Sequence, residues 1–386
     1  MDKGTTKSSF GQLVAPLEKA SIQQIIDVYD GDKYVKKLTT WIYLKIMLQA
    51  QLQQKKGLRS VRKMLLNKHL QAEMELESIS SSQLSRTGER LDPDIFRDIY
   101  LLLSKNVQDI MDSQKQRFGH MARIKLIDSS TVSLCLQKYP WAKHIRTKAG
   151  VKLHQRLVFV NEDFVYPDQA VITPAKPDDR SQMTSLINEE GVIYVFDRGY
   201  EDYGKFDLFC ENHIGFTTRL RRRAIIEVVE ELPVQEGSPI LRDTKVILGN
   251  PAKRMKNVLR RIESVDSLGN SIVILTNLFD ISAEEIGDMY RYRWKIELFF
   301  KYMKQHLRMT EFYGTTERAV KTQIYIALIT YLLLTLLRLK CEEKRLRLLD
   351  IHRALVELMW EPWLVMLKHL TRRPTRTSKG RQKKRE

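Results

Sequence analysis

Short apolar runs rich in β-branched residues fill the middle of the chain, and stretches with helical periodicity flank them. Gly, Pro and Asp bound these runs, as is typical of strands in a sheet. The runs occupy residues 122–134, 151–160, 169–175, 191–200 and 215–220, and more follow from about 221 to 279. Residues 10–118 instead place apolar side chains three and four positions apart, as an amphipathic helix does. The sequence therefore predicts an α/β chain in which helical regions precede and follow a strand-rich core.

Three regions are expected along the chain. Residues 1–118 form a helical N-terminal domain, 119–335 an α/β domain with a β-rich insertion at about 221–279, and 336–386 a helical C-terminal region with a basic tail. The longest apolar run, 324–337, has 14 residues, whereas a helix that crosses a bilayer needs about 20. We expect a buried core helix there and no membrane partner. Residues 1–14 lack the apolar segment of a signal peptide, which favours a cytoplasmic protein.

The charge of the chain is strongly positive. Lys and Arg number 65 against 47 Asp and Glu, so the formal net charge is +18. Such an excess repels itself unless a polyanion neutralises it, and nucleic acid is the first expected partner, ahead of an anionic membrane surface. Residues 371–386 hold eight basic residues and one Glu. We expect this tail to bind DNA without sequence preference.

Two aspartates follow predicted strands. Asp128 ends the apolar run IKLI, and Asp197 ends the run VIYVF. A charged group at the end of a buried strand lies at the edge of the sheet, where loops form binding sites. The alternative is that each aspartate only starts a turn or caps a helix, because Asp-Ser and Asp-Arg-Gly are common turn sequences.

A third carboxylate lies on a predicted helix that begins at Ser282, which forms a capping box with Glu285. Four residues of this helix are spaced by three, four and seven: Tyr290, Arg293, Glu297 and Lys304. At about 100° per residue they fall within an arc of roughly 60° on one face of the helix. The alternative for Arg293 and Glu297 is an ordinary i, i+4 ion pair, which contributes only a few tenths of a kcal/mol, about 0.2–0.5.

Together, Asp128, Asp197 and Glu297 can bind two divalent cations through oxygen ligands. Mg²⁺ suits such a site because it takes a few carboxylates together with water and substrate phosphate, and Mn²⁺ is a plausible substitute. Two such ions support in-line cleavage of a phosphodiester. A cation also removes the repulsion between carboxylates that lie close together.

The spacing Y-x2-R-x3-E-x6-K resembles the signature of DDE transposases of the IS-four family of bacterial insertion sequences. LIDSSTVSL around Asp128, VFDRGYEDY around Asp197 and YRYRWKIELFFKYMKQHL around Glu297 are similar to that family's three catalytic blocks. The resemblance covers residues 120–335. It implies a ribonuclease-H-like catalytic core, with Asp128 on the first strand, Asp197 after the fourth, and Glu297 on the helix that follows the β-rich insertion.

The same resemblance implies cut-and-paste DNA transposition, in which the end of the element is cleaved and the freed 3′-hydroxyl attacks DNA. The expected partners are double-stranded DNA, as terminal inverted repeats and target, and a second copy of the chain in a synaptic homodimer. Tyr290, Arg293 and Lys304 are expected to contact the DNA backbone near the cleavage point. The expected location is the bacterial cytoplasm, on the nucleoid. Two alternatives remain: a non-catalytic DNA-binding product of a decayed element, and a ribonuclease-H-like structure-selective nuclease.

A basic stripe is predicted in the N-terminal domain. Lys55, Arg59, Arg62 and Lys63 share one face if the segment is a continuous helix, and such a face binds DNA phosphates. The alternative is a solvated helix surface. Residues 79–86, ISSSQLSR, could begin a helix that recognises bases, although Ser-rich helix starts are also common caps.

Two aromatic residues near the predicted site have ordinary explanations. His154 follows a strand, and a single histidine there is more often packed or hydrogen-bonded than a ligand. Trp294 lies just outside the arc of the four spaced residues. We interpret it as a core residue, with stacking on a DNA base as the alternative.

Overall fold

A computed structural model describes residues 7–113, 123–176, 179–265, 269–341 and 346–372. The chain divides into two compact units. The first comprises residues 1–103, 306–314 and 318–386, and the second comprises 104–305 and 315–317.

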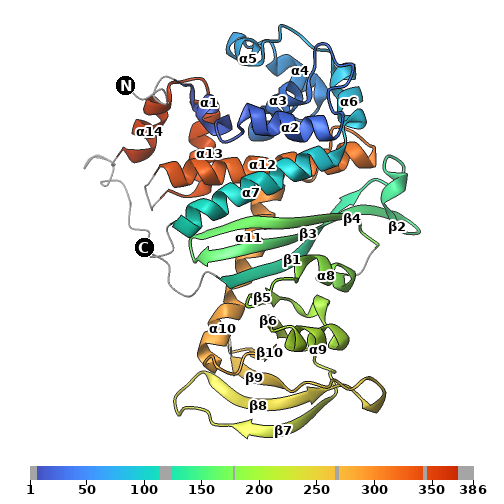
Figure 1. Cartoon of the computed structure of the whole chain (residues 1–386), viewed down its shortest axis with the longest axis vertical. Helices are drawn as coiled ribbons and strands as arrows, with labels where there is room; N and C mark the ends of the chain where they lie inside the picture. Colours follow the sequence, from blue (N-terminus) through green and yellow to red (C-terminus); the bar gives the residue numbers. More distant parts are fainter. Residues whose placement is uncertain (1–6, 114–122, 177–178, 266–268, 342–345, 373–386) are drawn as a thin grey trace, which may run out of the picture. The chain divides into compact units, whose positions relative to one another are not determined.

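A five-stranded core lies at the centre of the second unit (Figure 1). Its strands are β1 (Ile124–Leu134), β3 (Lys148–Asn161), β4 (Phe164–Pro174), β5 (Ile193–Phe196) and β6 (Gly215–Arg219). β1, β3 and β4 are antiparallel neighbours, whereas β5 pairs parallel with β1 and β6 pairs parallel with β5. The spatial order β4-β3-β1-β5-β6 is that of a ribonuclease-H-like sheet, which confirms the expected fold. A short strand, β2 (Lys143–Ile145), also pairs with β3.

The β-rich insertion extends this sheet. It consists of β7 (Ile226–Leu232), β8 (Ile240–Leu248), β9 (Leu259–Val265) and β10 (Ser271–Thr276). β10 pairs antiparallel with β6, and the order continues through β9 and β8 to β7. The insertion expected at about 221–279 is therefore confirmed as strands, and it continues the core sheet outward from β6.

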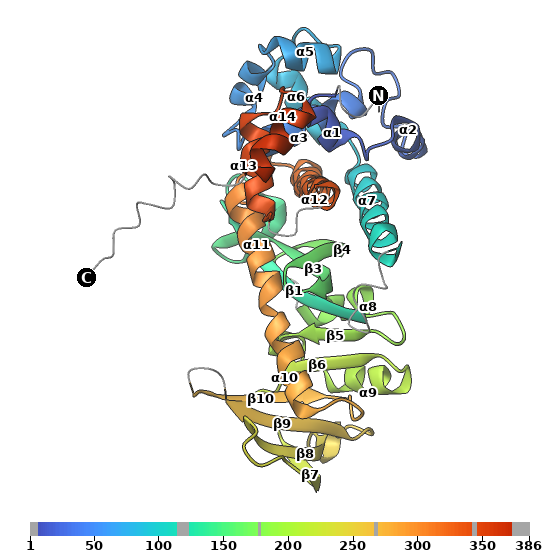
Figure 2. The same ribbon diagram turned by 90° about the vertical axis from the view of Figure 1, so that its left-hand side faces the viewer.

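Helices cover both faces of the sheet (Figure 2). On one side lie α8 (Met183–Leu186) and α9 (Tyr203–Glu211), and on the other lie α10 (Ala283–Tyr292) and α11 (Trp294–His306). Aromatic packing joins α9 to the strands, because the rings of Phe206 and Phe216 stack 4.6 Å apart between centroids. On the opposite face Ile286 of α10 packs with Ile262 and Ile274 of the insertion. Burial of these apolar surfaces is the main stabilising term for such a layered fold.

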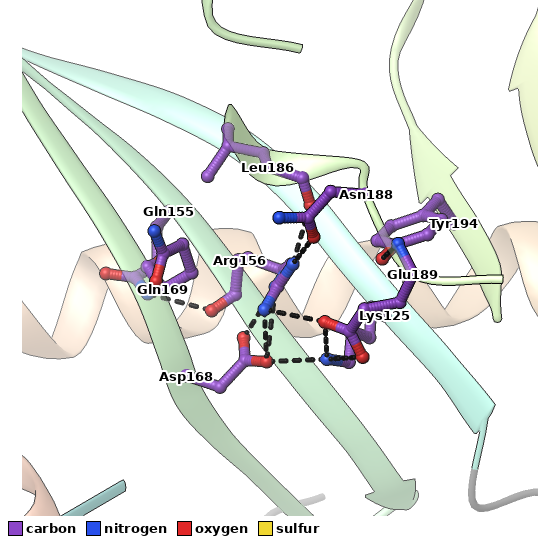
Figure 3. Close-up of polar contacts among 9 residues, drawn as sticks. All are labelled: Lys125, Gln155, Arg156, Asp168, Gln169, Leu186, Asn188, Glu189 and Tyr194. Carbon is purple, nitrogen blue, oxygen red and sulfur yellow. Dashed lines mark hydrogen bonds and ion pairs between the residues drawn. The ribbon is translucent and has the colours of Figure 1, made fainter. Parts of the chain in front are cut away.

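A network of ion pairs fixes the strands that precede the site (Figure 3). Arg156 of β3 contacts Asp168 of β4 at 2.9 Å and donates a hydrogen bond to the backbone oxygen of Leu186. Lys125 of β1 contacts Asp168 at 2.8 Å and Glu189 at 2.6 Å. The network therefore ties β1, β3 and β4 to the segment that enters β5.

The first unit is helical. Its N-terminal helices are α1 (Ser9–Val14), α2 (Lys19–Val28), α3 (Thr40–Leu52), α4 (Leu58–Met64), α5 (Lys68–Met74), α6 (Ser81–Arg90) and the start of α7 (Pro93–Ser113). Its C-terminal helices are α12 (Glu317–Lys340), α13 (Leu348–Glu357) and α14 (Trp363–Thr371). Short 3₁₀ turns of the second unit are Pro140–Ala142, Asp179–Gln182, Arg198–Tyr200 and Pro251–Lys253.

Helix α12 contains the longest apolar run. It is the one described helix long and apolar enough to cross a membrane, but 94% of its apolar window is buried inside the protein. Thr330 and Thr335 donate their hydroxyls to backbone oxygens one turn earlier, so their polar atoms are satisfied without water. The structure agrees with the expected core helix.

Candidate active site

Asp128 and Asp197 lie at the same level of the sheet on the neighbouring parallel strands β1 and β5. Asp197 follows the end of β5, whereas Asp128 lies within β1, which continues to Leu134 and pairs Asp128 with Gln155 of β3. The prediction that a strand ends at Asp128 is therefore wrong. In the pairing of β1 with β5, Ile127 lies opposite Phe196. Each aspartate is the next residue of its chain after this last pair, so both lie where β1 and β5 separate. The fold therefore places the two carboxylates side by side, as the order of the strands predicts.

Each aspartate is also held by a local backbone hydrogen bond. The Ser129 amide donates to Asp128 Oδ1 at 2.7 Å, and the Gly199 amide donates to Asp197 Oδ1 at 2.7 Å. Asp197 thereby caps the 3₁₀ turn Arg198–Tyr200. Asp197 therefore does cap a turn, which is the alternative that the sequence left open. This cap uses only Oδ1, so Oδ2 can still bind a ligand in the site.

The helix that carries Glu297 begins as the sequence predicts. The Glu285 amide donates to Ser282 Oγ and the Ser282 amide donates to Glu285 Oε2, both at 3.2 Å, so the capping box is confirmed. The helix is interrupted for one residue at Arg293, which keeps right-handed helical dihedral angles between α10 and α11. Because the helical path continues through Arg293, the four spaced residues from Tyr290 to Lys304 stay on one side of the combined helix α10–α11.

Arg293 joins two of the three carboxylates. Its Nη1 lies 3.3 Å from Asp128 Oδ2, and its Nη2 lies 2.5 Å from Glu297 Oε1. Lys304 Nζ donates to the backbone oxygen of Thr131 on β1 at 3.4 Å, and the Arg293 guanidinium lies 5.9 Å from the Tyr290 ring centroid. Arg293 and Glu297 do form the expected i, i+4 ion pair. Arg293 also contacts Asp128 of β1, so the pair is not an isolated surface ion pair.

Burial raises the pKa of Asp128 to about 7. Removal of the carboxylate from water is the largest cause, and the negative charges of Asp197 and Glu297 raise it further, while the Ser129 amide and Arg293 lower it. The three carboxylates therefore interact electrostatically across the end of the sheet. Holding all of them ionised is costly without an additional cation.

The residues fit a divalent cation by their chemistry. Carboxylate oxygens are the ligands that Mg²⁺ and Mn²⁺ prefer, and the charges of Asp197 and Glu297 add to the burial that raises the pKa of Asp128. Within the described ranges, no three His, Cys, Asp or Glu side chains lie close enough together to hold one ion. In this arrangement Arg293 contacts both Asp128 and Glu297 and supplies part of the positive charge.

Two residues beside the aspartates were not predicted from the sequence. The Ser129 hydroxyl donates to Asp179 Oδ1 at 2.7 Å, and Asp179 also contacts Lys152 at 3.2 Å. Tyr200 is 1% exposed, and desolvation together with the charges of Asp179, Asp128 and Asp197 raises its pKa well above the ordinary value. The sequence could have indicated Tyr200 only through its place in the segment VFDRGYEDY. No sequence pattern indicated Asp179.

His154 lies within β3 and is buried and hydrogen-bonded, as expected. Its Nε2 lies 3.1 Å from the Thr173 hydroxyl, and its Nδ1 lies 3.4 Å from Asp179 Oδ1. Desolvation lowers the pKa of His154 to about 4, although Asp179 raises it. The contact with Asp179 is therefore not an ion pair at neutral pH.

The interpretation of Trp294 as a core residue is wrong, because its side chain is 58% exposed. The buried face of α11 is supplied by Ile296, Phe299, Phe300 and Met303. At about 100° per residue, Trp294 projects on the side of the helix opposite Ile296. The alternative for Trp294, stacking on a DNA base, stays a prediction.

The basic stripe of the N-terminal region is not one helical face. Helix α3 ends at Leu52 and α4 begins at Leu58, so Lys55 lies in the connecting segment. A turn at Gln54, which has a positive φ of 49°, separates the helices. Arg59, Arg62 and Lys63 do lie on α4, and all three are exposed.

Two family models match the chain. The model described as a transposase DDE domain matches residues 119–333, which include all three carboxylates of the site. A domain of unknown function matches residues 5–74.

Curated relatives also match the chain. A protein named as a transposase for insertion sequence element IS5377, from Geobacillus stearothermophilus, is 34% identical over 55% of this chain and 55% of its own length. A protein named as a transposase from Sinorhizobium fredii is 32% identical over 58% of this chain and 63% of its own length. The chain thus spans less than two thirds of these relatives. Among solved structures, a piggyBac transposase synaptic complex with hairpin DNA aligns over 97% of this chain and 84% of its own, with a TM-score of 0.46 and 9% identity.

Proposed function

The chain belongs to the transposase DDE domain family, and from this premise we propose that it is a transposase of the IS-four type. It cleaves DNA at the ends of an insertion sequence and transfers the cut strand to target DNA. The observation that carries the proposal is the arrangement of Asp128, Asp197 and Glu297. Two contacts support it: the pairing of β1 with β5 ends next to both Asp128 and Asp197, and Arg293 contacts Asp128 and Glu297.

Asp128, Asp197 and Glu297 are proposed to hold two divalent cations, Mg²⁺ or Mn²⁺. The family implies dependence on a divalent metal, and such ions, when bound, activate water for attack and stabilise the leaving oxygen of a phosphodiester. The protein's own part is positioning. The Ser129 and Gly199 amides orient the aspartates, and the ion pair with Arg293 orients Glu297.

The cationic and aromatic residues of the same helix are proposed to hold the DNA. Arg293 and Lys304 face β1 and carry the positive charge that a phosphate beside the carboxylates requires. Tyr290 is half-buried next to Arg293, and it is proposed to contact the backbone near the cleavage point.

Further contacts to DNA are proposed outside the site. Lys55, Arg59, Arg62 and Lys63 bind phosphates in the N-terminal region, on two segments and not on one face. The basic tail of residues 371–386 is proposed to bind DNA without sequence preference, although residues 373–386 lie outside the described part of the chain.

The proposed substrates are terminal inverted repeats and target DNA, held by a homodimer in the synaptic complex. Bringing two element ends together requires two copies of a site that has one set of carboxylates. The two curated relatives come from bacteria, and the proposed location is the bacterial cytoplasm, on the nucleoid.

The test uses the purified full chain, Mg²⁺ or Mn²⁺, and a DNA fragment that carries the gene with both flanks. Mapping of the product ends is expected to show cleavage at the boundaries of the element and joining to a second DNA. An Asp197→Asn variant serves as the control and is expected to bind the fragment without cutting it. Binding without cleavage by the unmodified chain would support the non-catalytic alternative, and cleavage without joining would support the nuclease.

A further inference from the structure

Helices α4 and α6 of the first unit pack against each other (Figure 1). A basic pocket lies between them. Its volume is about 790 Å³. Lys56, Arg59 and Arg86 line it together with the hydroxyl-bearing residues Ser60, Ser81, Ser82 and Ser85. None of the described residues that line it carries a carboxylate. The charged side chains that line the pocket are therefore all positive, and serine hydroxyls add hydrogen-bonding groups.

The three cations of this pocket have no anionic partner among the residues that the structure describes. Arg59, Arg86 and Lys56 are exposed, and within the described ranges no Asp or Glu forms an ion pair with them. Elsewhere in the unit, by contrast, Arg97 pairs with two aspartates at 2.8 and 3.0 Å. Cations gathered in a hollow and left unpaired repel one another unless an external anion binds.

The start of α6 adds further donors to the same pocket. Ser80 caps the helix by accepting from the Gln83 amide, so Ser81 and Ser82 are its first two residues. Backbone amides in the first turn of a helix have no partner within the helix and favour an anion. The Tyr313 ring provides an apolar wall, and its hydroxyl donates to the Lys55 backbone oxygen at 2.7 Å, which fixes the loop that carries Lys56.

We propose that this pocket binds a segment of DNA backbone, with phosphates on Lys56, Arg59, Arg86 and the α6 serines and sugar against Tyr313. The inference rests on the proposed function for its substrate class and adds a site at residues 56–60, 81–86 and 313. A volume of this size takes a whole small molecule and is larger than a single phosphate needs. Phosphate contacts of this kind fix the position of a protein on DNA and do not read its sequence.

The test measures duplex binding by the full chain over a range of salt concentrations, with a 30-base-pair duplex as the probe. Each phosphate contact adds about 0.9 to the slope of log affinity against log salt. We expect Arg59→Ala/Arg86→Ala to lower the slope by about 2 and to weaken binding at least tenfold at moderate salt. The matched control is Lys36→Ala/Lys37→Ala, which removes the same charge from exposed residues of the same unit outside the pocket.

A second variant separates binding from folding. Ser82→Asp places a negative charge in the first turn of α6, where it stabilises the helix, but the same charge repels a phosphate in the pocket. We expect an unchanged or raised Tm together with at least tenfold weaker binding. Binding within twofold of the unmodified chain for both Ser82→Asp and Arg59→Ala/Arg86→Ala would overturn the proposal, as would an equal loss in the control.

Failure of this proposal can be distinguished from failure of the proposed function. If the pocket does not bind DNA, the pocket variants bind and cleave like the unmodified chain. If the chain is not a transposase, no variant cleaves DNA, and the salt slopes still decide whether the pocket holds the backbone.

Discussion

Replacing Arg156 with Met tests whether the ion-pair network of Arg156, Asp168, Lys125 and Glu189 stabilises the strands that carry the site. The Arg156 side chain is 8% exposed and contacts Asp168, which is 13% exposed. Removing one partner of a buried ion pair costs about 3–5 kcal/mol, because the other charge stays buried and unpaired. In the variant, Lys125 still contacts Asp168 at 2.8 Å, so Asp168 keeps one cationic partner. We therefore expect the free energy of unfolding to fall by about 3 kcal/mol, the lower end of this range.

The assay is thermal unfolding of the full chain by calorimetry, with hydrogen exchange of β3 and β4 to assign the transition to the second unit. For a unit of this size, 1 kcal/mol shifts the Tm by about 2–4 °C, so Arg156→Met is expected to lower it by about 6–12 °C. The double variant Arg156→Met/Asp168→Leu should recover part of this loss, because Lys125 keeps Glu189 as its partner.

The matched control is Arg242→Met. Arg242 pairs with Glu231 on strands of the same sheet, but the two side chains are 44% and 56% exposed, and exposed pairs contribute little. We expect no measurable change in Tm for this variant. If Arg156→Met lowers the Tm no more than Arg242→Met does, the ion-pair network does not stabilise the sheet.

Three further predictions concern the site. A Cβ at Gly199 would lie 2.8 Å from Asp197 Oδ1, so Gly199→Ala should slow DNA cleavage strongly with little change in Tm; equal cleavage rates would show that this carboxylate orientation is unimportant. Because the pKa of His154 is lowered to about 4 in the folded state, it takes up a proton only in the unfolded chain between about pH 6.5 and 4, so stability should fall across that window by at most about 3 kcal/mol. Denaturant unfolding at pH 7 and pH 5 should show a smaller difference for His154→Gln, and an identical difference would contradict a buried neutral imidazole. Trp294→Ala should leave the Tm unchanged, because the side chain is 58% exposed, and should weaken binding of DNA ends; a large fall in Tm would restore its role as a core residue.

Much of the core could be predicted from local sequence. The runs that end at Asp128 and Asp197 are apolar and β-branched, and two parallel strands necessarily bring their carboxyl ends to one edge of the sheet. The start of the helix that carries Glu297 was predicted because a capping box depends only on Ser282 and Glu285. The start of this helix follows from a contact that is short in sequence.

Other features depend on contacts between distant segments. The sequence shows strands at 221–279 but does not show that β10 pairs with β6, which joins the insertion to the core sheet. The break of the basic stripe at Lys55 comes from a left-handed turn at Gln54, a residue type that gives no warning of positive φ. The pocket between α4 and α6 combines residues around 57, 83 and 313, and no local pattern predicts such a combination.

The most direct test of the account is DNA cleavage by Glu297→Gln compared with Asp288→Asn. Both variants remove one negative charge from the same stretch of helix, but Asp288 is exposed and pairs with Arg291, whereas Glu297 contacts Arg293 beside Asp128. With Mg²⁺ and a fragment that carries the element's ends, Glu297→Gln is predicted to bind the DNA and to leave it uncut, while Asp288→Asn cuts like the unmodified chain. Normal cleavage by Glu297→Gln would contradict the central claim that these three carboxylates form the active site.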